Sequence, residues 1–148
     1  TYNLHIALRF QMELGLLSGD LAVADLPGAW NETSQKLLGL TPKTDTEGCL
    51  QDIHWSFGGI GYFPTYTLGN LFAAQFMDAA GRDLGDLPAS FRRGDFAPLK
   101  GWLNERIHAH GRRFRAAQLC KRATGAEPTA TPFVRYLKGK YGELYGVG

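Results

Sequence analysis

Apolar residues recur every three or four positions along most of this chain, which is the spacing of one face of an α-helix. No segment alternates apolar and polar residues as a half-buried strand would. The pattern predicts helices over residues 1–17, from Asp25 to about Gly39, from Pro64 to about residue 80, over 87–92, from Asp95 to near Gly111, over 114–123, and from Thr131 onward. The sequence therefore predicts an all-α fold, with residues 1–148 forming a single domain or part of a larger one.

Four positions within the expected helices carry more specific predictions. Arg9 and Glu13 lie four residues apart, so they could form an ion pair on the outer face of the first helix. Gly69, inside the helix that begins at Pro64, is unfavourable by about 0.5–1 kcal/mol relative to alanine. We therefore expect a close neighbour to require the glycine, and we expect Leu68 on the buried side of the same helix.

Residues 40–61 break the helical pattern with turn-forming residues and glycines, and such loops often carry functional side chains. Asp52 and His54 are two positions apart, so an extended backbone would place both on one side. A carboxylate beside an imidazole orients its tautomer and raises its pKa, which suits substrate binding or proton transfer. The alternative is that Asp52 caps a helical turn and His54 is a hydrogen-bonded structural residue.

The segment GGIG at 58–61 precedes the helix that begins at Pro64. Free N–H groups at a helix N-terminus favour an anion, but the glycine spacing matches neither GxxxxGK[ST] nor GxGxxG. A tight turn leading into a packed helix is the competing interpretation. Tyr62 and Tyr66 lie four residues apart and could present both hydroxyls to one cleft or bury their rings.

Composition narrows the class of protein. Hydrophobic residues make up 44% of the 148 residues and charged residues 20%, which excludes wholesale disorder. The net charge of +2 is too small to favour nucleic acid or an anionic membrane, and no apolar stretch approaches the length of a membrane span. Two cysteines, Cys49 and Cys120, cannot build a disulfide framework, which favours a soluble cytoplasmic protein.

The basic stretch from Arg106 to Arg122 could bind an acidic partner such as nucleic acid, although such a run is more often a solvated helix face. His108 and His110 would diverge by about 200° on a helix, so they are not expected to share a metal ion. The sequence contains no HExxH and no closely spaced cysteine pair. We therefore expect no metal site in this chain.

Four segments together make the chain recognisable. The segment GCLQDIHW at 48–55 matches GxxQDxHW, a signature of the M32 family of metallocarboxypeptidases, the thermostable carboxypeptidase group. The match continues in TYNLHIALRF at 1–10, GYFPTYTLGN at 61–70 and FVRYLKGKYGELYG at 133–146. The chain resembles the C-terminal part of such an enzyme over essentially its whole length, and its start resembles a helix interior.

The resemblance implies a long, helical, zincin-like protein, usually a homodimer, that uses a divalent metal, zinc or cobalt, to remove C-terminal amino acids from peptides. The family motifs that supply the metal ligands and the catalytic glutamate lie upstream of the matched region and are absent from residues 1–148. The resemblance therefore implies that this chain by itself is inactive, and that its partner is the N-terminal catalytic portion of the same enzyme.

The resemblance also assigns substrate-binding residues. One group would close the end of the groove that receives the substrate's C-terminus, namely Gly48, Gln51, Asp52, His54 and Trp55. Tyr62 and Tyr66 would line the same wall, and His54 would donate a hydrogen bond to the peptide or its oxyanion. The alternative is a helical binding or interaction module that has kept the fold and lost the chemistry.

Overall fold

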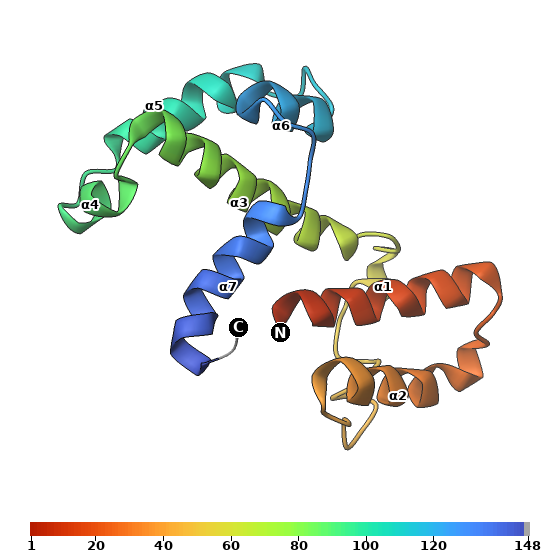
Figure 1. Ribbon diagram of the computed structural model, residues 1–148. Coiled ribbons are helices and arrows are strands. Elements are labelled where there is room, and N and C mark those ends of the chain that lie inside the picture. Colours follow the sequence, from red (N-terminus) through yellow and green to blue (C-terminus); the bar gives the residue numbers. More distant parts are fainter. Residues whose placement is uncertain (147–148) are drawn as a thin grey trace. The chain divides into compact units, whose positions relative to one another are not determined.

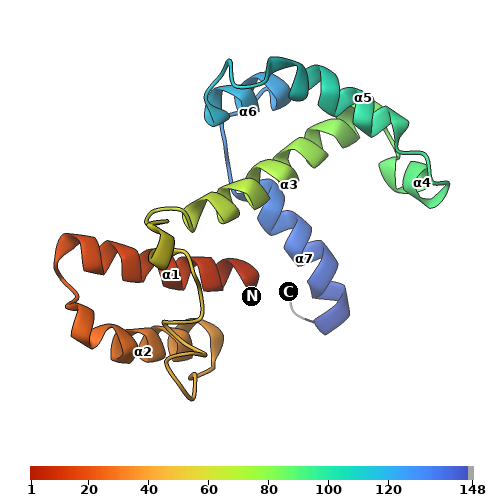
Figure 2. The same ribbon diagram turned by 180° about the vertical axis from the view of Figure 1, so that it is seen from behind.

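The computed structural model describes residues 1–146, which form helices and connecting segments without any strand (Figures 1 and 2). The all-α prediction is therefore confirmed. The chain divides into two compact units, Thr1–Leu68 and the residues from Gly69 onward. Whether residues 1–148 make one domain or part of a larger one stays a prediction.

The first unit is built on two helices, α1 (Tyr2–Ser18) and α2 (Leu26–Leu38), which lie side by side in both ribbon views. A 3₁₀ turn, η1 (Val23–Asp25), precedes α2, and the 3₁₀ turn η2 (Trp55–Phe57) follows in the long loop after it. Apolar residues from α1, α2 and that loop form one core: Leu8, Met12, Leu26, Trp30 and Cys49.

Glycine ends α2 where the sequence predicts. Gly39 follows Leu38 with φ of +71°, and its N–H donates to the Gln35 carbonyl at 3.0 Å. The left-handed conformation closes the last turn of a helix at little cost for a residue without Cβ. The chain therefore leaves α2 at a defined point and enters the loop that carries the candidate site.

The second unit contains most of α3 (Pro64–Leu84) with the elements that follow it. These are α4 (Leu87–Arg92), α5 (Ala97–Arg106), the 3₁₀ turn η3 (His108–His110), α6 (Ala116–Thr124) and α7 (Thr131–Tyr145). Its core gathers residues from α3, α4, α5 and α6: Ala79, Ala80, Leu87, Trp102 and Ala123.

A buried glutamine connects α3 to the segment between α6 and α7. Gln75 is 4% exposed, and its amide nitrogen donates to the Glu127 carbonyl at 3.0 Å and to the Thr124 hydroxyl at 3.2 Å. Its amide oxygen accepts from the Thr129 N–H at 3.0 Å. A polar group in the interior is tolerated because these partners replace the water that it loses on burial.

Several details differ from the sequence-based predictions. The helix expected from Asp95 to Gly111 ends at Arg106, and His108 and His110 lie in a separate 3₁₀ turn. Leu68 is 48% exposed rather than buried. A Cβ on Gly69 would meet nothing within 4 Å, so the expected close neighbour is absent among the described residues.

Candidate functional site

A charged side chain from α1 holds the loop that contains the GxxQDxHW segment. Arg9 is 5% exposed, and its Nε donates to Asp52 Oδ2 at 2.5 Å. Its Nη2 donates to Gln51 Oε1 at 2.7 Å, and its Nη1 to the His5 carbonyl at 2.9 Å. The guanidinium also lies over the Trp30 ring, 5.0 Å from the centroid. One arginine therefore binds two successive loop residues at once.

A second α1 residue binds the same loop on the other side of His54. Glu13 is 2% exposed, and its Oε1 accepts from the Trp55 indole N–H at 3.0 Å. The Trp55 ring packs edge-to-face on Trp30 with centroids 6.2 Å apart. The other carboxylate oxygen of Glu13 is buried without a hydrogen-bond partner among the described residues.

Arg9 and Glu13 are the site residues that the sequence analysis misplaced. They were expected to pair with each other on the outer face of α1, but both are buried and each binds the loop instead. Their position was readable in principle, because Ile6 and Met12 lie on either side of Arg9 on the buried face of the helix.

His54 lies between these two anchor points and pairs with a tyrosine from α3. Its Nε2 is 3.0 Å from the Tyr66 hydroxyl oxygen, while its Nδ1 is buried without a partner among the described residues. The imidazole lies against Phe63 with centroids 4.4 Å apart, and Tyr62 stacks 5.9 Å away. Burial raises the pKa of the Tyr66 phenol, with Tyr62 a smaller cause.

The pairing of Asp52 with His54, which an extended backbone would allow, does not occur. Residues 52 and 54 do not form an extended strand, since His54 has φ of −56° and ψ of −47°. Asp52 binds Arg9 and His54 binds Tyr66, so the two side chains serve different contacts. The carboxylate therefore anchors the loop and does not orient the imidazole directly.

The backbone turns sharply just after His54. The Gly59 N–H donates to the His54 carbonyl at 2.7 Å, and a Cβ on Gly59 would lie 2.9 Å from that oxygen and 2.8 Å from the Phe57 ring. Gly59 is thus required by the close approach of two backbone segments. The tight-turn interpretation of GGIG accounts for this glycine.

The remaining sequence-predicted residues fall into two groups. Gly48 is buried, where a Cβ would lie 3.3 Å from both Pro42 and Trp30, so it is a packing residue. Gln51 and Tyr62 are exposed, and Tyr62 also packs edge-to-face on Tyr66 with centroids 5.4 Å apart. The structure thus gathers His54, Tyr62 and Tyr66 in one aromatic cluster and leaves Gly48 in the core.

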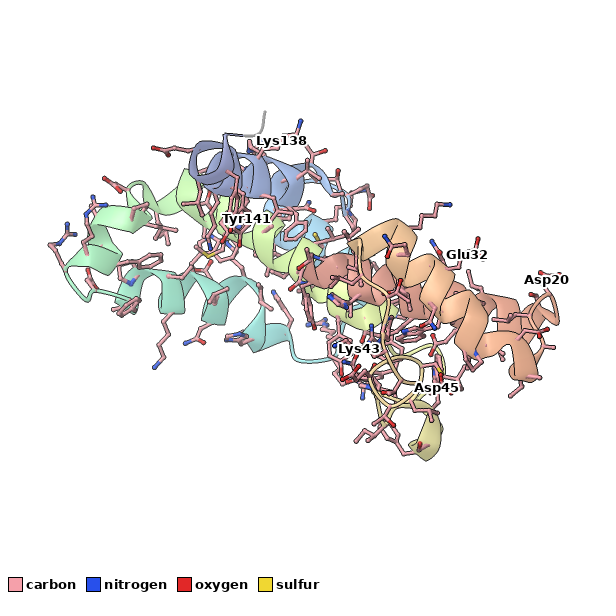
Figure 3. All side chains as sticks on the ribbon, turned by 90° about the horizontal axis from the view of Figure 1, so that it is seen from below. Asp20, Glu32, Lys43, Asp45, Lys138 and Tyr141 are labelled. Atoms are coloured by element: carbon pink, nitrogen blue, oxygen red, sulfur yellow. The ribbon has the colours of Figure 1, made fainter. Side chains whose placement is uncertain are left out.

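A cavity of about 310 Å³ lies beside the Arg9 anchor. Arg9 and Gln51 line it together with Lys43 and Glu47 from the loop after α2. Figure 3 labels Lys43 and Asp45 on this loop. A hollow of about 590 Å³ in the second unit, lined by residues of α3 and α7, contains none of the predicted site residues.

The candidate site does not offer a ligand set for a metal ion. Its potential ligands are His54, Asp52 and Glu13, and each is directed at a different protein partner. Across residues 1–146 no three side chains of histidine, cysteine, aspartate or glutamate gather closely enough to hold a metal. The described residues therefore do not fit the divalent metal implied by the resemblance.

None of the helices formed by the described residues combines the length and apolarity needed to cross a membrane.

Known proteins resemble this chain both in sequence and in fold. A family model described as "Carboxypeptidase Taq (M32) metallopeptidase" matches residues 1–141. Thermostable carboxypeptidase 1 of Thermus thermophilus is 52% identical over 146 residues, which cover 99% of this chain and 29% of that protein. Carboxypeptidase 1 of Bacillus subtilis is 45% identical over 145 residues, which cover 98% of this chain and 29% of that protein.

The comparison with solved structures points to the same family as the sequence comparisons. The crystal structure of an M32 carboxypeptidase from Deinococcus radiodurans matches with a TM-score of 0.95 at 50% identity, covering 99% of this chain and 30% of that one. This chain spans less than a third of the length of the relatives that it matches.

Proposed function

This chain belongs to the M32 metallopeptidase family, and on that premise we propose that the complete gene product is a metal-dependent carboxypeptidase whose C-terminal part is this chain. The chain supplies part of the substrate groove, and the substrate is the C-terminal end of a peptide. The observation that carries this proposal is the pairing of His54, which lies inside the segment 48–55 that the family signature marks, with Tyr66 of α3 at 3.0 Å.

The His54–Tyr66 pair has the chemistry of a hydrogen-bond donor to a substrate oxygen. Since Nδ1 of His54 is buried, Nε2 is the nitrogen available to Tyr66. When Nε2 carries the proton and donates to the phenol oxygen, the Tyr66 hydroxyl proton is free to donate outward. A tyrosine phenol holds its proton at neutral pH, and burial raises the pKa of Tyr66 further.

This donor acts on the oxygen of the scissile peptide bond. As the carbonyl becomes tetrahedral, negative charge develops on that oxygen, and a fixed donor stabilises it without reorganisation. Loss of one such donor costs about 10²–10³ in kcat. Gln51, Asp52 and Trp55 serve this site indirectly, because their side chains hold the segment on α1.

The remaining parts of the reaction lie outside this chain. The N-terminal catalytic portion of the same protein holds the divalent metal, zinc or cobalt, together with the catalytic glutamate. The protein is a cytoplasmic homodimer. Cys49 and Cys120, both buried free thiols, are compatible with a reducing compartment.

The test is the release of the C-terminal amino acid from an N-blocked dipeptide by the complete gene product. We expect Tyr66→Phe and His54→Ala to lower kcat by about 10²–10³. His54→Gln should retain more activity than His54→Ala, because the glutamine amide can still donate to the Tyr66 oxygen.

Tyr145→Phe is the matched control, since Tyr145 is exposed on α7 and its substitution should leave kcat unchanged. A wild-type protein that releases no amino acid with either metal would contradict the proposed activity. It would favour the binding-module alternative. An active wild type with fully active Tyr66→Phe and His54→Ala variants would contradict only the assigned roles.

A further inference from the structure

We propose that Arg9 and Glu13 are positioning residues that fix the His54 imidazole for its hydrogen bond to Tyr66, an inference that rests on the proposed function. They lie one helical turn apart on α1 and bind the loop on the two sides of His54. Neither residue touches the substrate oxygen. Both act through His54.

The Arg9 contacts fix the segment before His54. The planar guanidinium donates from two different nitrogens to the side chains of Asp52 and Gln51, and so defines both the position and the orientation of these residues. The Asp52 side chain is 31% exposed and that of Arg9 is 7% exposed, so solvent screens this ion pair only partly.

The Glu13 contact fixes the segment after His54. Trp55 follows His54 directly, and its indole N–H reaches a carboxylate oxygen that is shielded from water. The ring of Trp55 therefore has little freedom to rotate, and the backbone of His54 is held from this side as well.

The Phe63 ring carries the same constraint to the imidazole itself. The Arg9 guanidinium lies 5.5 Å from the centroid of Phe63, and the ring centroid of His54 lies 4.4 Å from that of Phe63. Phe63 is 3% exposed and lies just before α3, which carries Tyr66. Arg9 thus supports both partners of the His54–Tyr66 hydrogen bond.

The experiment measures kcat/KM of the complete gene product in a double-mutant cycle. We expect Arg9→Met to lower kcat/KM by about 10- to 100-fold when His54 is present. In a His54→Ala background the same change should cost less than about threefold, because the residue through which Arg9 acts is already absent. A purely structural role would give equal losses in the two backgrounds and would overturn the inference.

Conservative variants keep the test decisive if Arg9→Met does not fold. Arg9→Lys keeps the charge but cannot bridge Gln51 and Asp52 with one planar group, so we expect about a tenfold loss. Glu13→Gln keeps an oxygen acceptor for Trp55 and should stay within about threefold of wild type, whereas Glu13→Leu should lose about tenfold. Equal activities of Glu13→Gln and Glu13→Leu would contradict the role of Glu13.

Arg82→Met is the matched control. Arg82 also binds an aspartate, Asp78 at 2.6 Å, but on the exposed face of α3 in the second unit, so kcat/KM should not change. NMR signals of the His54 ring in selectively labelled protein provide a readout that does not need activity. They should shift in Arg9→Lys and not in Arg82→Met.

The outcomes separate this inference from the proposed function. If the wild type is inactive but the His54 signals shift in the Arg9→Lys variant, the proposed function is overturned and the positioning of the ring is supported. An active wild type, an impaired His54→Ala variant and a fully active Arg9→Lys variant with unshifted His54 signals overturn the positioning inference alone.

Discussion

Gly59 is the position of the candidate site at which the surrounding atoms leave no room for a side chain. Gly59 lies where the loop folds back on the His54 carbonyl, and the space that a Cβ would need is already occupied by that oxygen and by the Phe57 ring. The oxygen cannot move at low cost, since it belongs to the backbone that carries the imidazole. The shape of the turn is therefore coupled to the position of His54.

Replacing this glycine should damage the site. We expect Gly59→Ala to destabilise the protein by about 1–3 kcal/mol, the usual cost of overpacking, and to lower kcat as His54 is displaced. Thermal unfolding and the dipeptide assay measure the two effects.

Gly69→Ala is the matched control for that substitution. Gly69 lies inside α3, and nothing lies within 4 Å of where its Cβ would be. The same change should therefore stabilise the protein by about 0.5–1 kcal/mol through helix propensity. Equal effects of the two substitutions would contradict the close approach at Gly59.

At the scale of elements, the buried amide of Gln75 connects α3 to the end of α6 and to the segment that joins α6 to α7. Gln75 uses both ends of its side chain, donating to residues 124 and 127 and accepting from residue 129. Gln75 itself is 4% exposed, and its partners are two backbone groups and a hydroxyl. The connection is polar, so hydrophobic patterning alone does not indicate it.

Gln75→Leu should remove the hydrogen bonds that the buried amide makes to residues 124, 127 and 129. We expect a loss of about 1–3 kcal/mol in the free energy of unfolding, measured by urea denaturation. Gln11→Leu, on the exposed face of α1, is the matched control and should change stability by less than about 0.5 kcal/mol. A Gln75→Leu variant as stable as the control would contradict the role of this amide.

The helices themselves were largely predictable, and the exceptions share a cause. The patterns at Gly39 and at residues 87–92 correctly predicted the end of α2 and the bounds of α4. The helix after Asp95 was predicted too long, because Ile107 leaves helical geometry with φ of −126° while its side chain packs on the second core. Tertiary packing there overrides local propensity.

At the scale of the whole molecule, the proposed reaction needs both a hydrogen-bond donor and a set of metal ligands, and the described residues provide only the first. The chain carries a candidate donor pair, His54 and Tyr66. The described residues contain no cluster of side chains that could hold the metal. A relative of similar fold is more than three times as long, as the 30% coverage of the Deinococcus radiodurans enzyme indicates.

The 148-residue chain by itself should therefore be inactive. We expect no amino acid to be released when it is incubated with Zn²⁺ or Co²⁺ and an N-blocked dipeptide. The complete gene product, assayed in parallel, should be active under the same conditions. Turnover by the short chain that saturates at one metal ion per chain would contradict this prediction.

The sequence by itself determined the all-α class, the family and the segment that carries His54, because helical periodicity and local motifs are properties of neighbouring residues. Only the tertiary structure decided which side chains meet. The bonds of Arg9 to Gln51 and Asp52, and of Glu13 to Trp55, join residues more than forty positions apart. Such contacts depend on how α1 packs against the loop. Because α1 is covered there, Arg9 and Glu13 are buried and bind the loop, although the sequence pattern placed them on the solvent face.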